Sequence, residues 1–117
     1  MAHKDVRIEF MVGDRRFEAV RFLKEGEVSV SGDEMLARTA GQNGGAIGEE
    51  DEKFLREHLG ELPTKLRGYW LVTDRRSPDH PRDVSCFVFF DGGGWCRDWD
   101  WLGGQWGDDG LVVRRCV

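Results

Sequence analysis

Two stretches near the N-terminus alternate apolar and polar side chains with the two-residue period of a half-buried β-strand. The first covers residues 6–12, whose apolar members on one face are Val6, Ile8, Phe10 and Val12. A polar turn at 13–16 follows, and apolar residues return over 17–23. Two strands joined by so short a turn predict a β-hairpin over residues 6–23.

Two helices are predicted in the middle of the chain. Ser31 followed by Glu34 forms a capping box, in which the serine oxygen accepts the N–H of the third helical residue. Gly41 stands where a left-handed C-terminal cap belongs, so this helix spans about 32–40. The second helix, about 49–60, begins with acidic residues, which the helix dipole favours there, and carries an apolar face.

The sequence from residue 69 onward is predicted to be β. Apolar stretches separated by turn residues follow one another at 69–72, 84–90, 95–101 and 111–117. The stretch 84–90 is apolar on both faces, which is typical of a central strand. We therefore expect a single α+β domain spanning residues 1–117, with two short helices packed on a mostly antiparallel sheet of about five to seven strands.

All five tryptophans follow residue 69, and three of them share one face of the stretch 95–101. These three, Trp95, Trp99 and Trp101, are expected to be core residues, because an aromatic side chain buries about 150–250 Å². The alternative is an aromatic platform for a protein or a sugar ring. Trp106 stands among glycines in a loop, where an exposed indole suggests contact with a partner.

A register for the last strands follows if their turn is centred on Trp106. The pairs that it predicts are Trp99 with Val113, Trp101 with Leu111, Asp98 with Arg114 and Cys96 with Cys116. This register places apolar side chains together on one face and an acidic residue opposite a basic one on the other.

Composition excludes several classes of protein. The 17 basic and 22 acidic side chains give a net charge of −5, which lacks the basic surface of a nucleic-acid-binding protein. No apolar segment approaches the ~18 residues of a membrane span, and no apolar signal core follows Met1. We therefore expect no nucleic-acid partner, no membrane association and a cytoplasmic location.

Cysteine spacing argues against a disulfide framework or a metal centre. The three cysteines, Cys86, Cys96 and Cys116, include no CxxC pair. Cys96 and Cys116 together with His80 have none of the usual zinc-ligand spacings, so we expect no metal and no cofactor. Cys86 lies in the apolar stretch 84–90 and is predicted to be a buried, unreactive thiol.

One pair of residues suggests hydrolytic chemistry. Asp98 and Asp100 stand two apart on a predicted strand, which places their carboxyl groups roughly 6–7 Å apart on one face. That separation is close to the one an inverting glycosidase uses. The sequence has no serine-hydrolase, zinc-protease or phosphate-loop motif, so an enzyme is the weaker hypothesis.

Two charged segments admit a binding role. Arg75, Arg76 and Arg82, with His80 between them, could grip an anion or an acidic partner, although a solvated loop is the favoured interpretation. The acidic run 49–52 could imitate nucleic acid, but helix-terminus electrostatics and solubility account for it.

Part of the chain resembles small uncharacterised bacterial proteins that join a helix–helix unit to a Trp-rich, Gly-turned β tail. The segments that carry this resemblance are Ser31–Leu36, Gly48–Pro63, Tyr69–Val72 and Asp91–Trp95. It covers about residues 28–117 and implies a bacterial source, but no activity, ligand or catalytic residue.

These observations favour a non-enzymatic binding or regulatory module that contacts a protein partner through its Trp-rich C-terminal sheet and loops. Trp106 leads the candidate contact residues, followed by Arg75, Arg76 and Arg82. A glycoside hydrolase using Asp98 and Asp100, and an acidic mimic of nucleic acid, are the alternatives. A homodimer is compatible with the sequence.

Overall fold

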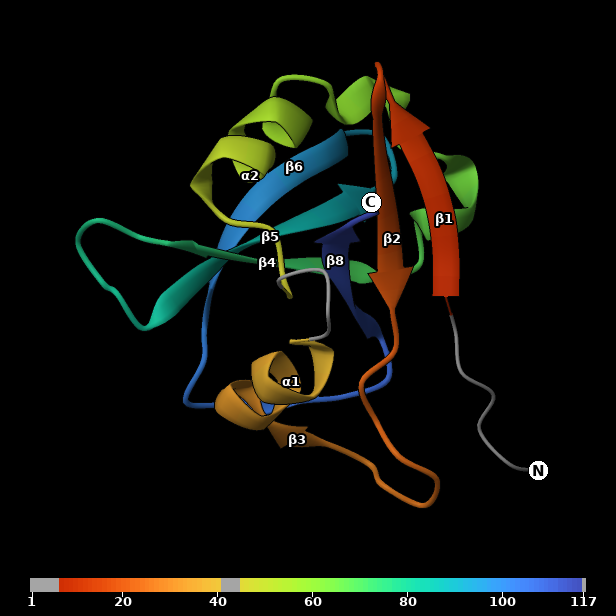
Figure 1. Cartoon of the computed structure of the whole chain (residues 1–117). Coiled ribbons are helices and arrows are strands. Elements are labelled where there is room, and N and C mark those ends of the chain that lie inside the picture. Colours follow the sequence, from red (N-terminus) through yellow and green to blue (C-terminus); the bar gives the residue numbers. More distant parts are fainter. Residues whose placement is uncertain (1–6, 41–44, 117) are drawn as a thin grey trace.

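The computed structural model describes residues 7–40 and 45–116, which form an α+β domain (Figure 1). Its strands are β1 (Arg7–Val12), β2 (Arg15–Val20), β3 (Val30–Ser31), β4 (Trp70–Arg76), β5 (Asp83–Phe90), β6 (Gly94–Trp101), β7 (Gln105–Trp106) and β8 (Gly110–Arg115). Its helices are α1 (Gly32–Thr39) and α2 (Glu49–Arg56), with short 3-10 turns η1 (Leu59–Glu61) and η2 (Thr64–Leu66). Gly41, the predicted C-terminal cap, lies outside the described residues.

Within these residues, six strands form one sheet in the order β1-β2-β8-β4-β5-β6, and β3 and β7 form a separate two-stranded sheet. All neighbours are antiparallel except β4 and β8, which are parallel. The last strand, β8, therefore lies in the middle of the sheet, between the N-terminal hairpin and β4 (Figure 1).

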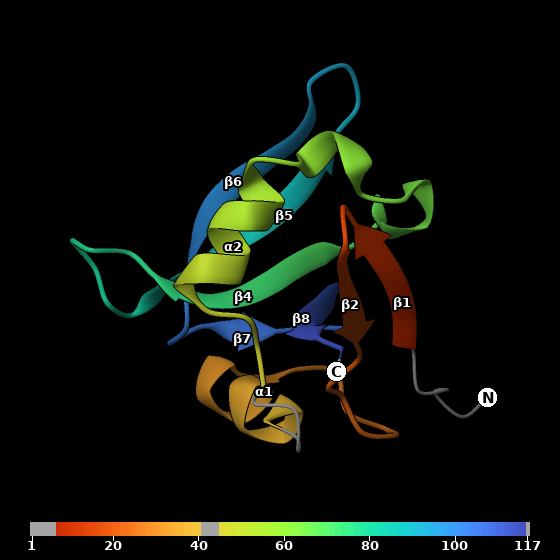
Figure 2. The ribbon, with the colours of Figure 1, turned by 45° about the horizontal axis from the view of Figure 1, so that its top comes forward.

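The large sheet carries an apolar core on each face. Because neighbouring strand residues point to opposite faces, Leu71 and Leu111 join one cluster and Val72 and Val112 the other. The first cluster is covered by α2 and the 3-10 turns through Leu55 and other leucines. The second is covered by α1 and by the small sheet, and Figure 2 shows α1 beside β7 and away from α2.

The predicted capping box of α1 is confirmed on the serine side, since the Ser31 hydroxyl accepts the Glu34 N–H at 3.1 Å. The second helix is shorter than the predicted 49–60, because α2 ends at Arg56. There the His58 N–H bonds the Leu55 carbonyl, an i→i−3 contact that tightens the last turn, and η1 follows.

The predicted pairing of the last two long strands is wrong. Strand β6 pairs only with β5, which places Trp99 opposite Ser85 and Asp98 opposite Cys86. Between β6 and β8 the chain forms β7, which pairs with β3 and carries the chain across two strands. The predicted contacts across that register, Asp98–Arg114 and Cys96–Cys116 among them, are therefore absent.

The burial pattern explains why β8 is central and β6 is at the edge. Residues 110–113 of β8 are all buried, as expected for a strand covered on both faces. Strand β6 has no fully buried residue and mixes tryptophans with charges, which is typical of an edge strand.

Candidate functional site

A pocket of about 210 Å³ opens where the end of β6 meets β7 and the start of β4. Its walls include three tryptophans, two carboxylates and an amide, namely Trp70, Trp101, Trp106, Asp100, Asp109 and Gln105. We call this the tryptophan pocket. No two of its tryptophans come from the same strand, so only the folded chain brings them together.

Backbone contacts hold the walls of the tryptophan pocket in place. The Trp70 N–H donates to the Asp109 carbonyl at 2.8 Å. Trp106 pairs with Val30 in the small sheet, and the Ser29 hydroxyl donates to the Gln105 side-chain carbonyl at 3.0 Å. The pocket is therefore built on strands rather than on a free loop.

Trp101 is the exposed wall of the pocket, with 63% of its surface accessible. Its indole ring lies against the backbone of Gly103 so closely that a Cβ at that glycine would overlap the ring. Trp101 also lines a second pocket, beside His80 and Arg82.

The expectation that Trp95, Trp99 and Trp101 are core residues is wrong for the exposed Trp101, and the other two are only partly buried, with Trp95 packed against the core cluster that α2 covers. Trp95 is half-buried against the edge of Phe89, with ring centroids 5.5 Å apart, and Trp99 is half-buried beneath the Arg97 guanidinium at 4.1 Å. The reason is the edge position of β6, which has a neighbouring strand on one side only.

Trp106 also differs from the expectation of an exposed loop tip. It belongs to β7, is half-buried and packs against the core cluster beneath α1. Its indole Nε1 is buried and has no hydrogen-bond partner among the described residues.

No basic side chain among the described residues pairs with the carboxylates of the tryptophan pocket. Asp100 is half-buried, and its Oδ2 is buried without a hydrogen-bond partner in the described part of the chain. Burial, and then the nearby Asp98 carboxylate, raises the pKa of Asp100 above its usual value. Within residues 7–40 and 45–116, neither Asp100 nor Asp109 forms an ion pair.

Cys86 lies next to Asp100 and is completely buried, as predicted. Burial raises the pKa of its thiol well above the usual range, and the Asp100 carboxylate adds to that shift. A thiol in this setting is a packing group rather than a nucleophile.

The two aspartates proposed for hydrolysis contribute unequally. Asp100 lines the tryptophan pocket, whereas Asp98 is exposed and its Oδ1 accepts the Trp99 N–H at 3.0 Å. The second carboxylate on the pocket wall is Asp109. The glycoside hydrolase stays a prediction.

The candidate arginines are all engaged with carboxylates. Arg82 forms two hydrogen bonds with Asp33, at 2.8 and 2.9 Å, and Arg76 donates to Asp74 at 2.8 Å. Arg75 is on β4 rather than in a loop, and its guanidinium lies 3.5 Å from Glu52. These contacts neutralise the arginine charges that the sequence suggested as an anion-binding site.

Sequence reasoning missed the role of Glu52. The sequence predicts that it belongs to a solvated acidic run, but its side chain is fully buried between α2 and the sheet. The Ser85 hydroxyl donates to it at 2.6 Å, and the guanidinium groups around it belong to Arg56, Arg75 and Arg97. Its position three residues before the buried Leu55, on the same helix face, was the available signal.

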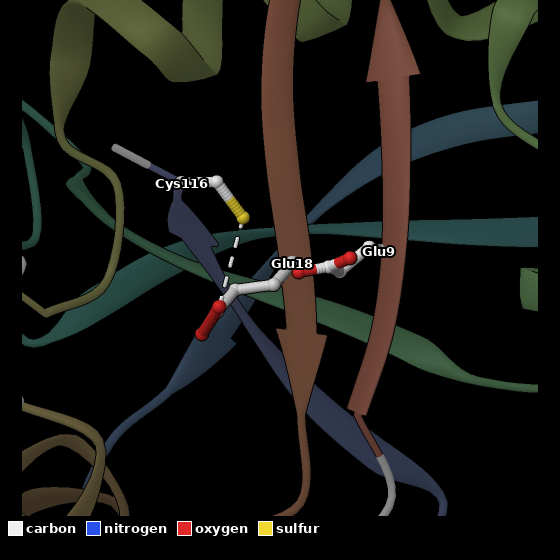
Figure 3. Close-up of side chains that lie close together, drawn as sticks. All are labelled: Glu9, Glu18 and Cys116. Carbon is white, nitrogen blue, oxygen red and sulfur yellow. Dashed lines mark hydrogen bonds between the residues drawn. The ribbon is translucent and has the colours of Figure 1, made fainter.

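A cluster of possible metal ligands lies on the N-terminal hairpin and directly after β8. Figure 3 shows Glu9, Glu18 and Cys116 close together, with their ligand atoms within 4.8 Å of one another. However, the buried Glu18 accepts hydrogen bonds from Arg7 and Arg114. Burial alone would raise the pKa of Glu18, but these arginines lower it below its usual value. Because two arginines already neutralise this carboxylate, we propose no metal here.

Across residues 7–40 and 45–116, every helix is too short or too polar to span a membrane. Comparison with known proteins adds no relative, since no family model, no curated protein and no solved structure matches the chain. The geometry of the tryptophan pocket is therefore the main indication of function.

Proposed function

We propose that the chain is a non-enzymatic binding module that contacts a protein partner through β6 and the tryptophan pocket. The observation that carries this proposal is the pocket itself, whose walls include three tryptophans from three strands. One of them, Trp101, is exposed. Exposed indoles on a rigid support are typical of the residues that dominate protein interfaces.

The edge position of β6 supports the same surface. Among the described strands β6 has one free edge, and the Asp98 side chain accepts the Trp99 N–H. Natural edge strands use charged side chains in this way to prevent indiscriminate pairing. A specific partner can therefore contact β6 without this edge promoting aggregation.

The test uses Trp101→Ala, because the exposed Trp101 contributes less to the core than Trp106 does. Phe90→Ala is the matched control, since Phe90 is 52% exposed and lies opposite Gly94, at the other end of β6. Tagged wild type and both variants, each checked for unchanged thermal unfolding, are used to capture proteins from a lysate. A captured protein is then purified and its binding remeasured with purified components.

The expected result is binding that Trp101→Ala abolishes and Phe90→Ala preserves, with hydrogen-exchange protection of β6 and β7 in the complex. Equal binding by all three proteins, protection confined to other elements, or no captured protein would overturn the proposal.

A further inference from the structure

The tryptophan pocket has a size that limits what it can accept. Pockets for drug-sized ligands generally enclose about 300–1,000 Å³. At about 210 Å³ this one is smaller, and suits a single side chain or a group of similar size.

The charge of the walls selects among such groups. Asp100 and Asp109 lie on the wall, and of the described residues no lysine or arginine lines the pocket. A half-buried carboxylate without a countercharge is electrostatically unfavourable, so a bound cation would be stabilised there more than in water. An anion would meet two carboxylates and is disfavoured.

The aromatic walls favour the same class of ligand. Indole faces attract ammonium and guanidinium groups, and tryptophan does so most strongly among the aromatic side chains. Trp101 presents an exposed ring that rests on Gly103, so its orientation is maintained without a ligand. A planar guanidinium can stack on such a ring while it hydrogen-bonds a carboxylate.

We infer that the tryptophan pocket binds the basic side chain of an arginine or lysine in the partner protein. The inference rests on the proposed function, since it names the chemistry of the residue that the module recognises. Asp100 and Trp101 are assigned as the contacts that select for positive charge, and Trp70 and Trp106 as the apolar walls.

The experiment titrates the full chain with Nα-acetyl-arginine methylamide, Nα-acetyl-lysine methylamide and the uncharged Nα-acetyl-norleucine methylamide. Binding is followed by tryptophan fluorescence and by the indole N–H resonances in NMR. We expect saturable shifts at Trp70, Trp101 and Trp106 with a basic probe, and at least ~10-fold weaker binding of the norleucine probe.

Variants of the pocket residues test which side chains select for a positively charged probe. Asp100→Asn is expected to weaken the basic probe by about 10-fold, whereas Asp98→Asn, an exposed carboxylate on the same strand but outside the pocket, changes it by no more than about 2-fold. Gly103→Ala leaves Trp101 in the sequence but displaces its ring, so it should weaken binding as Trp101→Ala does.

Several outcomes would overturn the inference. They are equal binding of norleucine and arginine probes, saturable binding of glucose in place of the basic probes, no saturable shift with any probe, or equal effects of Asp98→Asn and Asp100→Asn. Partner capture that depends on Trp101, without binding of a basic probe, would remove this inference and leave the proposed function standing. Probe binding without any protein partner would overturn the proposed function and the assignment of the basic group to a partner protein.

Discussion

Glu52, on α2, and Asp100, on β6, are both carboxylates withdrawn from water against the same sheet, but their surroundings are opposite. Glu52 belongs to α2, faces the sheet and is surrounded by Ser85 and three arginines. Asp100 faces the other side, next to Cys86, and lacks an ion pair within the described residues. Folding alone explains the first site, since a buried charge needs partners. The second is left uncompensated among the described residues, which supports the proposal that a basic group binds there.

The largest difference between the two sites is expected in stability. Glu52→Ala leaves Arg75 and Arg97 without their shared buried partner, so the free energy of unfolding should fall by about 3 kcal/mol. Urea unfolding measures this. The control is Glu50→Ala, whose side chain is 90% exposed and whose loss should change the value by less than about 0.5 kcal/mol. Equal effects of the two variants would remove Glu52 as a structural centre.

Asp100→Asn is expected to have the opposite sign. It removes a half-buried charge that has no countercharge, so unfolding free energy should stay constant or rise by up to about 1 kcal/mol. The same urea experiment applies, with Asp98→Asn as the exposed comparison. A loss of more than about 1 kcal/mol would show that the Asp100 carboxylate is stabilised within the chain.

The pKa values of paired and unpaired carboxylates should also shift in opposite directions. The hydrogen bonds from Arg38, and then from the Lys24 N–H, lower the pKa of Glu27 to about 2. Burial, followed by the Asp98 and Asp83 carboxylates, raises the pKa of Asp100, although the Cys86 hydrogen bond opposes this shift. Stability from Glu27 is therefore present above its unfolded value and is lost as the pH falls toward 2. The penalty at Asp100 is instead relieved as the pH falls through its folded pKa.

Carbon-detected NMR titration of the two carboxyl groups checks these directions. Arg38→Gln serves as the control, because it should return the Glu27 midpoint toward its ordinary value without moving that of Asp100. A midpoint for Asp100 below the usual aspartate range would contradict the unpaired assignment.

The last prediction concerns the order in which the three cysteine thiols are labelled. Cys96 is exposed, Cys116 half-buried and Cys86 fully buried beside Asp100, so labelling in the native state should proceed in that order. Mass spectrometry of the labelled chain at successive times measures it. Rapid modification of Cys86 would mean that the sheet face beneath the tryptophan pocket opens readily.

Local features of the chain were predictable because they depend on neighbouring residues. The Ser31 cap, the strands at residues 7–12 and 15–20, and the burial of Cys86 follow from spacing and periodicity. Trp106 and the pair Asp98 and Asp100 were singled out from sequence, and two of these three line the tryptophan pocket. Their pocket neighbour Trp70 was not, because it is distant along the chain. Asp109 is close to Trp106 in sequence, but no local pattern predicts that it lines a pocket.

By itself, the sequence determined the fold class, the two helices and the apolar stretches that became strands, since hydrophobic period and capping chemistry act over a few residues. Only the tertiary structure decided that β8 inserts beside β4, that β6 is left at the edge, and that Glu52 is enclosed by arginines while Asp100 is not. The physical reason is that strand order and charge pairing depend on contacts between distant segments, and alternative registers satisfy the same local pattern until the whole core is packed.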